Sequence, residues 1–298
     1  MSSGVLQRID RAQKDRRGLA VAVATVKKFS EDQSANLAAM IAFWAFFSVF
    51  PLFLVLVTLL AIFLPTSDKD AVLGHVAQMF PLLDPKTVKG LSGAWWTVVL
   101  GLATALWSGL GVVRTSQFAF NSVWGVPPGE QPGMVKQVLR SLGVLATVGL
   151  GLILTTLVSG LVVSSASGVH LGALGRIGGY VLSAALDVGI FVAAFRILTD
   201  RDVTTRDVLP GAILSGIAFF VLQQLSTLII SHYLKNAQST YGHFATVITI
   251  LWWFYLQSMI TMLGAELNVV LKEHDYPRSL TEGSKGKAGE RSHAAAGS

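Results

Sequence analysis

The sequence contains few charged residues and no cysteine. Only 13% of its 298 residues are Asp, Glu, Lys or Arg, whereas a soluble globular domain has about 25%. The mean hydropathy of +0.59 points the same way, and the two together indicate an integral membrane protein. The lack of cysteine excludes disulfides, cysteine-ligated zinc and thiol nucleophiles, although it does not fix the redox compartment.

Motifs for catalysis are also missing. The sequence has no GxSxG, no HExxH and no phosphate-cradling glycine loop. The stretch "GLGVVRTSQ" is not a dinucleotide fingerprint, because no strand precedes it. His and carboxylate residues do not cluster with metal-ligand spacing. We therefore expect no enzyme activity, no catalytic residues, no cofactor and no metal.

Long apolar segments are what the sequence does contain. A membrane-spanning helix needs about 20 mostly apolar residues. Six segments meet this requirement: Asn36–Leu64, Ala94–Val113, Ser141–Ser165, Ile177–Leu198, Val208–Ser231 and Phe244–Leu271. They lack the charged face of a soluble amphipathic helix and the alternation of barrel strands. The predicted fold is all-α, a polytopic integral membrane protein with six transmembrane helices.

Basic residues are divided unevenly between the two sides of this arrangement. The N-terminal arm, the loops after the second and fourth spans and the C-terminal tail hold 18 of the 23 Lys and Arg residues. Because basic loops stay on the cytoplasmic side, both termini are predicted to be cytoplasmic. The chain then divides into a basic arm (1–35), a transmembrane domain (36–271) and a disordered tail (272–298).

Asp187 lies near the middle of the apolar segment Ile177–Leu198. An ionised carboxylate at the centre of a bilayer costs at least ~2.5–3.5 kcal/mol, so it has to be paired, protonated or hydrated. Arg196 cannot be its partner on the same helix, because nine residues turn the two side chains to opposite faces about 14 Å apart. Asp187 is either a proton or substrate site, or a structural residue bonded to another helix.

Glu266 and Arg114 are predicted to lie at similar depth, near the cytoplasmic ends of the sixth and second spans. Their charges predict an ion pair between these helices, and Asn121 and Asn268 extend the polar cluster. Our first interpretation is that this ion pair has a structural role and stabilises the packing of the helix bundle. The same four residues, together with Asp187, are the candidates for a substrate or proton site.

Proline and glycine predict details of the helices. Pro51 predicts a kink in the first span, where Ser48 is placed to bond to the freed carbonyl group. Gly211 and Gly264 predict close helix packing. Pro210 is expected in the first turn of the fifth span, where its missing N–H costs little.

Membrane lipids are the expected partners. The segment Val5–Phe29 mixes basic and apolar residues, so it is either a helix on the anionic membrane surface or a solvated arm. Asp70–Leu83 is typical of an amphipathic helix on the outer face. Although the pI is about 9.7, the charge follows the membrane topology, and no nucleic-acid partner is expected. No pattern in the sequence predicts the oligomeric state.

Several stretches together resemble the YihY/BrkB family of bacterial inner-membrane proteins. They are Ser48 to Pro51, the run from Trp107 and Ser108 through Arg114 to Asn121, Pro210 to Ala212, Tyr241 and Gly242, Leu251 and Trp252, and Gly264 to Asn268. The resemblance covers about residues 30–272. It implies a six-span protein of the bacterial inner membrane that is described as a candidate transporter. It also implies that the older label ribonuclease BN is to be distrusted.

Three functions remain open at this point. The first is a transporter or flippase-like protein for a lipid or another amphiphilic or ionic substrate, which the buried charge of Asp187 favours. The alternative is a non-transporting scaffold that binds anionic lipid or a protein partner through its basic arm. A membrane-embedded enzyme is the third, and no motif supports it.

Overall fold

The computed structural model describes residues 16–63, 95–127, 138–144, 173–226 and 244–278, together with helical backbone at 146, 147, 150 and 151. All regular structure within these residues is helical. The helices are α2 (Arg17–Glu31), α3 (Ser34–Phe63), α6 (Trp95–Val123), α8 (Ala173–Leu198), α9 (Thr205–Gln224) and α11 (Phe244–Lys272). The predicted all-α fold is confirmed.

Five of these helices, α3, α6, α8, α9 and α11, are long and apolar enough to cross a membrane. They correspond to five of the six predicted spans. Most of the remaining one, Ser141–Ser165, lies outside the described residues, as does the predicted helix Asp70–Leu83. Large apolar side chains on these helices, such as Trp107, Val181 and Ile217, are at least half exposed, as lipid-facing side chains are.

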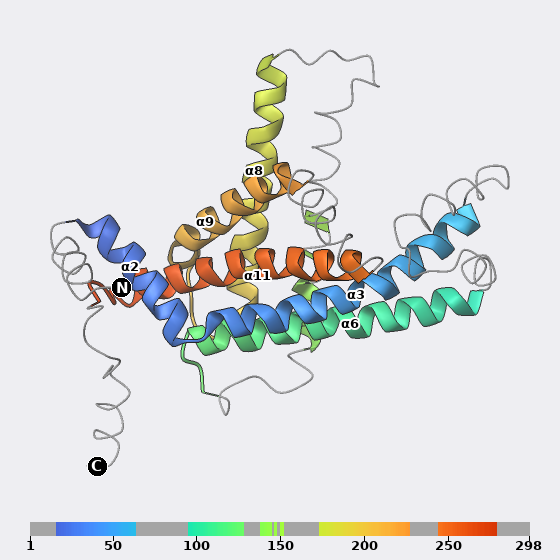
Figure 1. The fold of residues 1–298 in the computed structure, drawn as a ribbon, viewed down its shortest axis with the longest axis horizontal. Helices are drawn as coiled ribbons and strands as arrows, with labels where there is room; N and C mark the ends of the chain where they lie inside the picture. Colours follow the sequence, from blue (N-terminus) through green and yellow to red (C-terminus); the bar gives the residue numbers. More distant parts are fainter. Residues whose placement is uncertain are drawn as a thin grey trace.

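Helix α11 occupies the centre of the arrangement. It packs on α2, α3 and α9, while α3 pairs with α6 and α8 pairs with α9 (Figure 1). The shared core contains apolar side chains from all five long helices, among them Ile41, Phe120, Phe195, Ala212 and Met262. These residues are far apart in the sequence, so they form one core only when the helices pack against one another.

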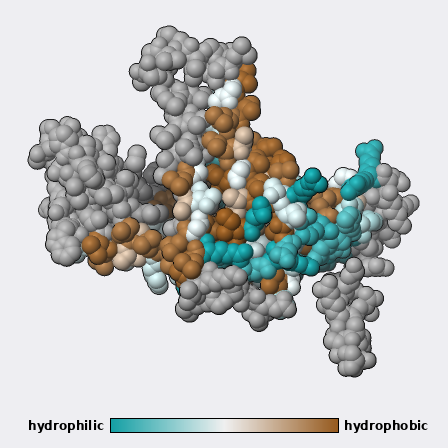
Figure 2. All heavy atoms as spheres, turned by 180° about the vertical axis from the view of Figure 1, so that it is seen from behind, coloured by the Kyte–Doolittle hydropathy of each residue, from teal (hydrophilic) through white to brown (hydrophobic). Residues whose placement is uncertain are grey.

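The helices α3 and α9 begin, and α6, α8 and α11 end, at the side of the bundle where α2 lies; we call this the α2 end (Figure 1). Seen from behind, hydrophilic side chains gather over this end, and hydrophobic ones dominate much of the remaining described surface (Figure 2). Such a separation is typical of a membrane protein with one polar end in water or among lipid headgroups.

Helix α2 lies within the arm predicted over residues 1–35. Its side chains at Ala20, Ala24 and Lys28 are buried, whereas Leu19 and Val26 are exposed. The four-residue spacing of the buried side chains places them on one face of the helix. Residues 17–31 are therefore packed against the bundle, mainly on α11. The division into arm, membrane domain and tail stays a prediction.

Two predicted boundaries are corrected by the structure. Helix α6 does not end near Val113 but continues for ten residues to Val123, because the polar side chains of this stretch, such as Gln117 and Asn121, are buried against other helices. Helix α9 begins at Thr205, where Asp207 accepts a hydrogen bond from the backbone N–H of Thr204 at 2.8 Å.

Pro210 is consequently the sixth residue of α9 and lies beyond its first turn, contrary to the prediction. Pro51 lies inside α3 as predicted, and the second half of α3 bends away from the line of the first half (Figure 1). Ser48, however, donates its hydrogen bond to the carbonyl oxygen of Ala45 at 2.7 Å. The prediction that it bonds to the carbonyl freed by Pro51 is wrong, since that group belongs to Phe47, four residues before the proline.

Helices α9 and α11 approach closely where two glycines meet. A Cβ atom added at Gly211 would lie 2.0 Å from the carbonyl oxygen of Gly264. A Cβ atom added at Gly264 would lie 2.0 Å from Oγ of Ser215. No larger side chain fits at either position without moving the backbone, so the predicted close packing is confirmed.

Candidate functional site

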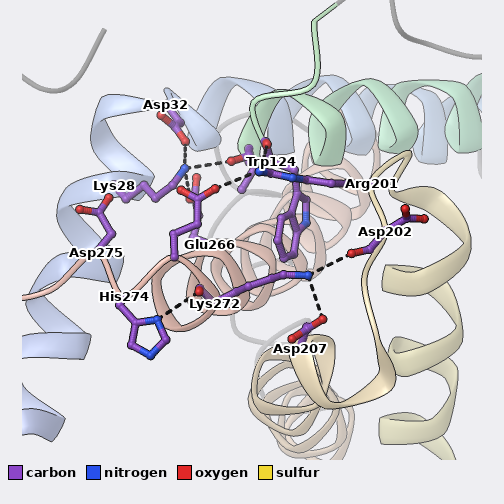
Figure 3. Close-up of polar contacts among 12 residues, drawn as sticks. Lys28, Asp32, Trp124, Arg201, Asp202, Asp207, Glu266, Lys272, His274 and Asp275 are labelled. Atoms are coloured by element: carbon purple, nitrogen blue, oxygen red, sulfur yellow. Dashed lines mark hydrogen bonds and ion pairs between the residues drawn. The ribbon is translucent and has the colours of Figure 1, made fainter. Parts of the chain in front are cut away.

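Glu266 lies inside the α2 end of the bundle. Its residue is 0% exposed, and its Oε2 atom lies 3.1 Å from Nζ of Lys28 on α2. Ser34, at the start of α3, donates a hydrogen bond to Oε1 of the same carboxylate. Figure 3 shows the Lys28 side chain reaching from α2 toward Glu266 on α11. One carboxylate therefore ties together α2, α3 and α11.

Lys28 makes two further contacts at this junction. Its Nζ atom donates to the Asp32 carboxylate and, at 3.0 Å, to the carbonyl oxygen of Val123 at the end of α6. Burial by itself lowers the pKa of Lys28, but the carboxylates of Glu266 and Asp32 more than offset this, so the pKa is raised above its usual value. Lys28 is therefore a charged, buried link between α2, α6 and α11.

The predicted ion pair between Arg114 and Glu266 is wrong. The side chain of Arg114 is exposed, and Lys28 occupies the position beside Glu266. The reason is depth: Lys28 bridges Glu266 and Val123, so Glu266 is level with the end of α6. Arg114 lies nine residues earlier on α6, which is about 13 Å deeper.

Lys272 forms a second link at the α2 end. Its Nζ atom lies 2.9 Å from Oδ2 of Asp207 and donates to the carbonyl oxygen of Asp202 at 3.0 Å. The same ammonium group lies 5.7 Å from the centre of the Trp124 ring (Figure 3). These contacts join the end of α11 to the start of α9 and to the residue that follows α6.

Asn121 is buried and belongs to a third polar group. Its Nδ2 donates to Asp200 at 2.6 Å, and its Oδ1 accepts from the backbone N–H of Asp200 at 2.9 Å. Arg140 donates to the other oxygen of the Asp200 carboxylate and, at 3.2 Å, to the carbonyl oxygen of Thr199. This group fastens the connection between α8 and α9 to α6 and to the helical residues 138–144.

Replacing Asp200 with alanine is expected to destabilise the protein by roughly 1–3 kcal/mol, because Asn121 and Arg140 would both lose a buried partner. Thermal unfolding of the detergent-purified protein measures the effect. Asp202→Ala removes an exposed carboxylate two residues further along and is the matched control. Equal unfolding midpoints for the two variants would contradict this account of Asp200.

Asn268 is buried at the crossing of α9 and α11. Its Oδ1 accepts a hydrogen bond from the backbone N–H of Gly211 at 2.6 Å. Its Nδ2 atom has no hydrogen-bond partner within the described part of the chain. Asn268 therefore accepts a hydrogen bond directly from the backbone of α9.

Asp187 is buried inside the bundle, with 2% of its surface exposed. Its Oδ1 atom has no hydrogen-bond partner in the described residues. Gln117 of α6 is buried to the same extent, and both polar atoms of its amide lack partners in that same part of the structure. Buried polar groups without partners cost about 1–3 kcal/mol each. The interior of the bundle therefore contains hydrogen-bonding atoms, on Asp187 and Gln117, that the described residues do not pair.

The predicted site residues thus occupy different places in the structure. Glu266 and Asn268 lie on the last turns of α11, Asn121 belongs to the Asp200 group, and Arg114 is exposed. Within the described residues, no hydrogen bond or ion pair joins Asp187 to any of them. A shared role of these five residues stays a prediction.

Sequence reasoning missed Lys28, Ser34, Asp200 and Arg140 as members of these polar groups. In the sequence, Lys28 and Arg140 contribute only to the excess of basic residues that predicts the topology, and nothing local distinguishes a buried lysine from a solvated one. A carboxylate at Glu266 near a span end did signal that a basic partner exists. Among the described residues, no three His, Asp or Glu side chains converge as metal ligands.

Five apolar helices with buried polar links between them define a polytopic helical membrane protein. The family model described as virulence factor BrkB matches residues 25–288, and the chain belongs to this family. The resemblance stated from the sequence is therefore confirmed.

Curated relatives agree with this membership. The chain is similar to the ribonuclease-like protein YfkH of Bacillus subtilis (strain 168), with 24% identity over 82% of this chain and 92% of the relative. It is also 26% identical to a UPF0761 membrane protein of Pseudomonas aeruginosa (strain LESB58), over 80% of this chain. The match spans 60% of the length of that relative. No solved structure matches.

Proposed function

We propose that this protein moves a lipid or another amphiphilic or ionic substrate across the membrane. Asp187 is the group that meets the polar part of the substrate or a coupled proton. The observation that carries the proposal is the burial of this carboxylate in a span, where its Oδ1 atom has no hydrogen-bond partner among the described residues. An intramembrane acid is retained against its insertion cost when it serves transport or proton relay.

The depth of Asp187 supports this role. It lies ten residues from the start and eleven from the end of the span Ile177–Leu198, about 15 Å from either boundary. Gln117 is a second buried side chain whose amide atoms have no partner in the part of the chain that the structure describes. A substrate headgroup, a proton or water that reaches the depth of Asp187 would meet a buried carboxylate there.

We place the α2 end in the cytoplasm of a bacterial cell, in the inner membrane. The basis is the excess of Lys and Arg in the segments that lead to this end. The chain would then present Asp187 near the midplane and its ion-paired junction on the cytoplasmic side.

Asp187→Asn is expected to slow transport by about tenfold or more, since the loss of one charge-dependent interaction in the transition state is worth at least ~1.4 kcal/mol. The measurement is the rate at which fluorescent phospholipids become accessible across the bilayer of proteoliposomes. Asp202→Asn is the matched control, because Asp202 is exposed outside the spans.

Two outcomes would count against the proposal. Wild-type protein that moves lipid no faster than protein-free vesicles would remove the transport function for this substrate class. Equal rates for Asp187→Asn and Asp202→Asn would remove Asp187 from the mechanism while leaving transport standing.

The alternative is a scaffold that binds anionic lipid through its N-terminal arm, and one observation favours it. Helix α2 buries one face against the bundle but exposes Leu19 and Val26 on another, with Arg16 also exposed. This pattern suits a helix at the membrane surface. Under this alternative, Asp187→Asn is harmless, whereas removal of residues 1–15 impairs attachment to anionic vesicles.

A further inference from the structure

An open groove lies against α8 near the α2 end. Its volume is about 510 Å³, and it is lined by Arg140, Gly189, Val192, Ala193, Arg196 and Ile197. The residues from α8 recur every three or four positions, so they form one face of the helix. At 100° per residue this face is turned away from Asp187. The groove is therefore separate from the proposed transport group.

The groove has a positively charged end. Arg196 is exposed and donates to Oγ1 of Thr205 at 3.0 Å, whereas Arg140 is anchored by Asp200. Two guanidinium groups against one carboxylate leave a net positive charge there. The planar guanidinium group binds phosphate oxygens in pairs, and such charge-assisted bonds are stronger than neutral ones.

The rest of the groove is apolar and has room. Val192, Ala193 and Ile197 line it, and a Cβ atom added at Gly189 would meet nothing within 4 Å. From Arg196 to Gly189 the groove follows α8 for about 10 Å toward the middle of the span. Arg196 itself lies in the last turn of the span, at the depth of lipid headgroups.

We propose that this groove binds one anionic glycerophospholipid. The phosphate lies between Arg140 and Arg196, and an acyl chain follows the apolar face over Val192 and Gly189. Charge complementarity selects an anionic headgroup, and the apolar length selects a lipid over a free phosphate ion. The site goes beyond the proposed transport function and does not depend on it, because it lies on the other side of α8 from Asp187.

Native mass spectrometry of the full-length protein in detergent tests this site with phosphatidylglycerol and phosphatidylcholine of equal chain length. The wild type is expected to retain phosphatidylglycerol about tenfold more strongly, and Arg196→Gln is expected to abolish that preference. Arg206→Gln is the matched control, because Arg206 is an exposed arginine at the same end that does not line the groove. It should bind like the wild type.

A second pair of variants tests the apolar part without changing charge. Gly189→Leu fills the groove and is expected to weaken phosphatidylglycerol binding by several-fold, whereas Gly178→Leu on the same helix, also in open space, leaves it unchanged. Unfolding midpoints close to that of the wild type establish that both variants are folded.

Three results would overturn the proposal. One is equal binding of the two lipids, and another is equal loss in Arg196→Gln and Arg206→Gln. The third is full displacement of the lipid by millimolar inorganic phosphate, which would make the phosphate ion the ligand. Asp187→Asn is expected to lose lipid transport but to keep phosphatidylglycerol binding. The binding experiment therefore tests the groove even if the protein transports no lipid.

Discussion

Replacing Lys28 with methionine is expected to destabilise the protein by about 3–5 kcal/mol. Methionine keeps most of the volume of the side chain but removes its charge, which leaves the Glu266 carboxylate buried with no cation beside it. The hydrogen bond from Ser34 remains but cannot neutralise the charge. The unfolding midpoint of the detergent-purified protein, compared with that of the wild type, is the measurement.

Two further variants make this result specific to the buried pair. Lys27→Met removes the neighbouring lysine, which pairs with Glu31 at 3.7 Å nearer the surface, and should cost less than about 1 kcal/mol. Lys28→Met combined with Glu266→Gln should recover much of the lost stability, because no uncompensated charge is left. A double variant as unstable as the single one would show that Lys28 acts through packing rather than through its charge.

Replacing Gly211 with alanine is expected to destabilise the protein by about 3 kcal/mol. The added methyl group would lie 2.0 Å from the carbonyl oxygen of Gly264 and 2.6 Å from the Asn268 side chain. Relief requires α9 and α11 to separate, which also weakens the hydrogen bond between Gly211 and Asn268. Thermal unfolding measures this effect.

Gly178→Ala supplies the control for this prediction. Gly178 is also helical, but a Cβ atom there meets nothing within 4 Å. Alanine is a better helix former than glycine, so this variant should be neutral or stabilising by roughly 0.5–1 kcal/mol. Gly211→Ala with an unfolding midpoint equal to that of Gly178→Ala would contradict the close approach of α9 and α11.

The positions of the membrane-spanning helices could be predicted from the sequence, because each span requires a long apolar segment of consecutive residues. Phe244–Leu271 was predicted and α11 runs from Phe244 to Lys272, since hydrocarbon requires an uninterrupted apolar segment. The prediction for α6 ended too early at Val113, because polar residues buried between helices look like a loop on a hydropathy scale. The same effect hid the buried group around Asn121 and Asp200.

The candidate site could be predicted only in part. The sequence identified Asp187, Glu266, Asn121 and Asn268 as candidate polar site residues, and all four are buried. It assigned the wrong partner to Glu266, because Arg114 and Lys28 are both plausible cations when only distance along a span is known. Choosing between them requires the depth of α6 relative to α11 and the path of α2.

By itself, the sequence determined that this protein is a helical membrane protein and where its polar exceptions lie, since each follows from the cost of moving one residue type from water into hydrocarbon. Only the tertiary structure decided which charges meet. Lys28 reaches Glu266 across 238 residues of sequence because α2 folds back onto α11, and Arg140 and Arg196 line one groove although they lie on separate helices. Such contacts depend on the relative positions of whole helices, which no local pattern of residues specifies.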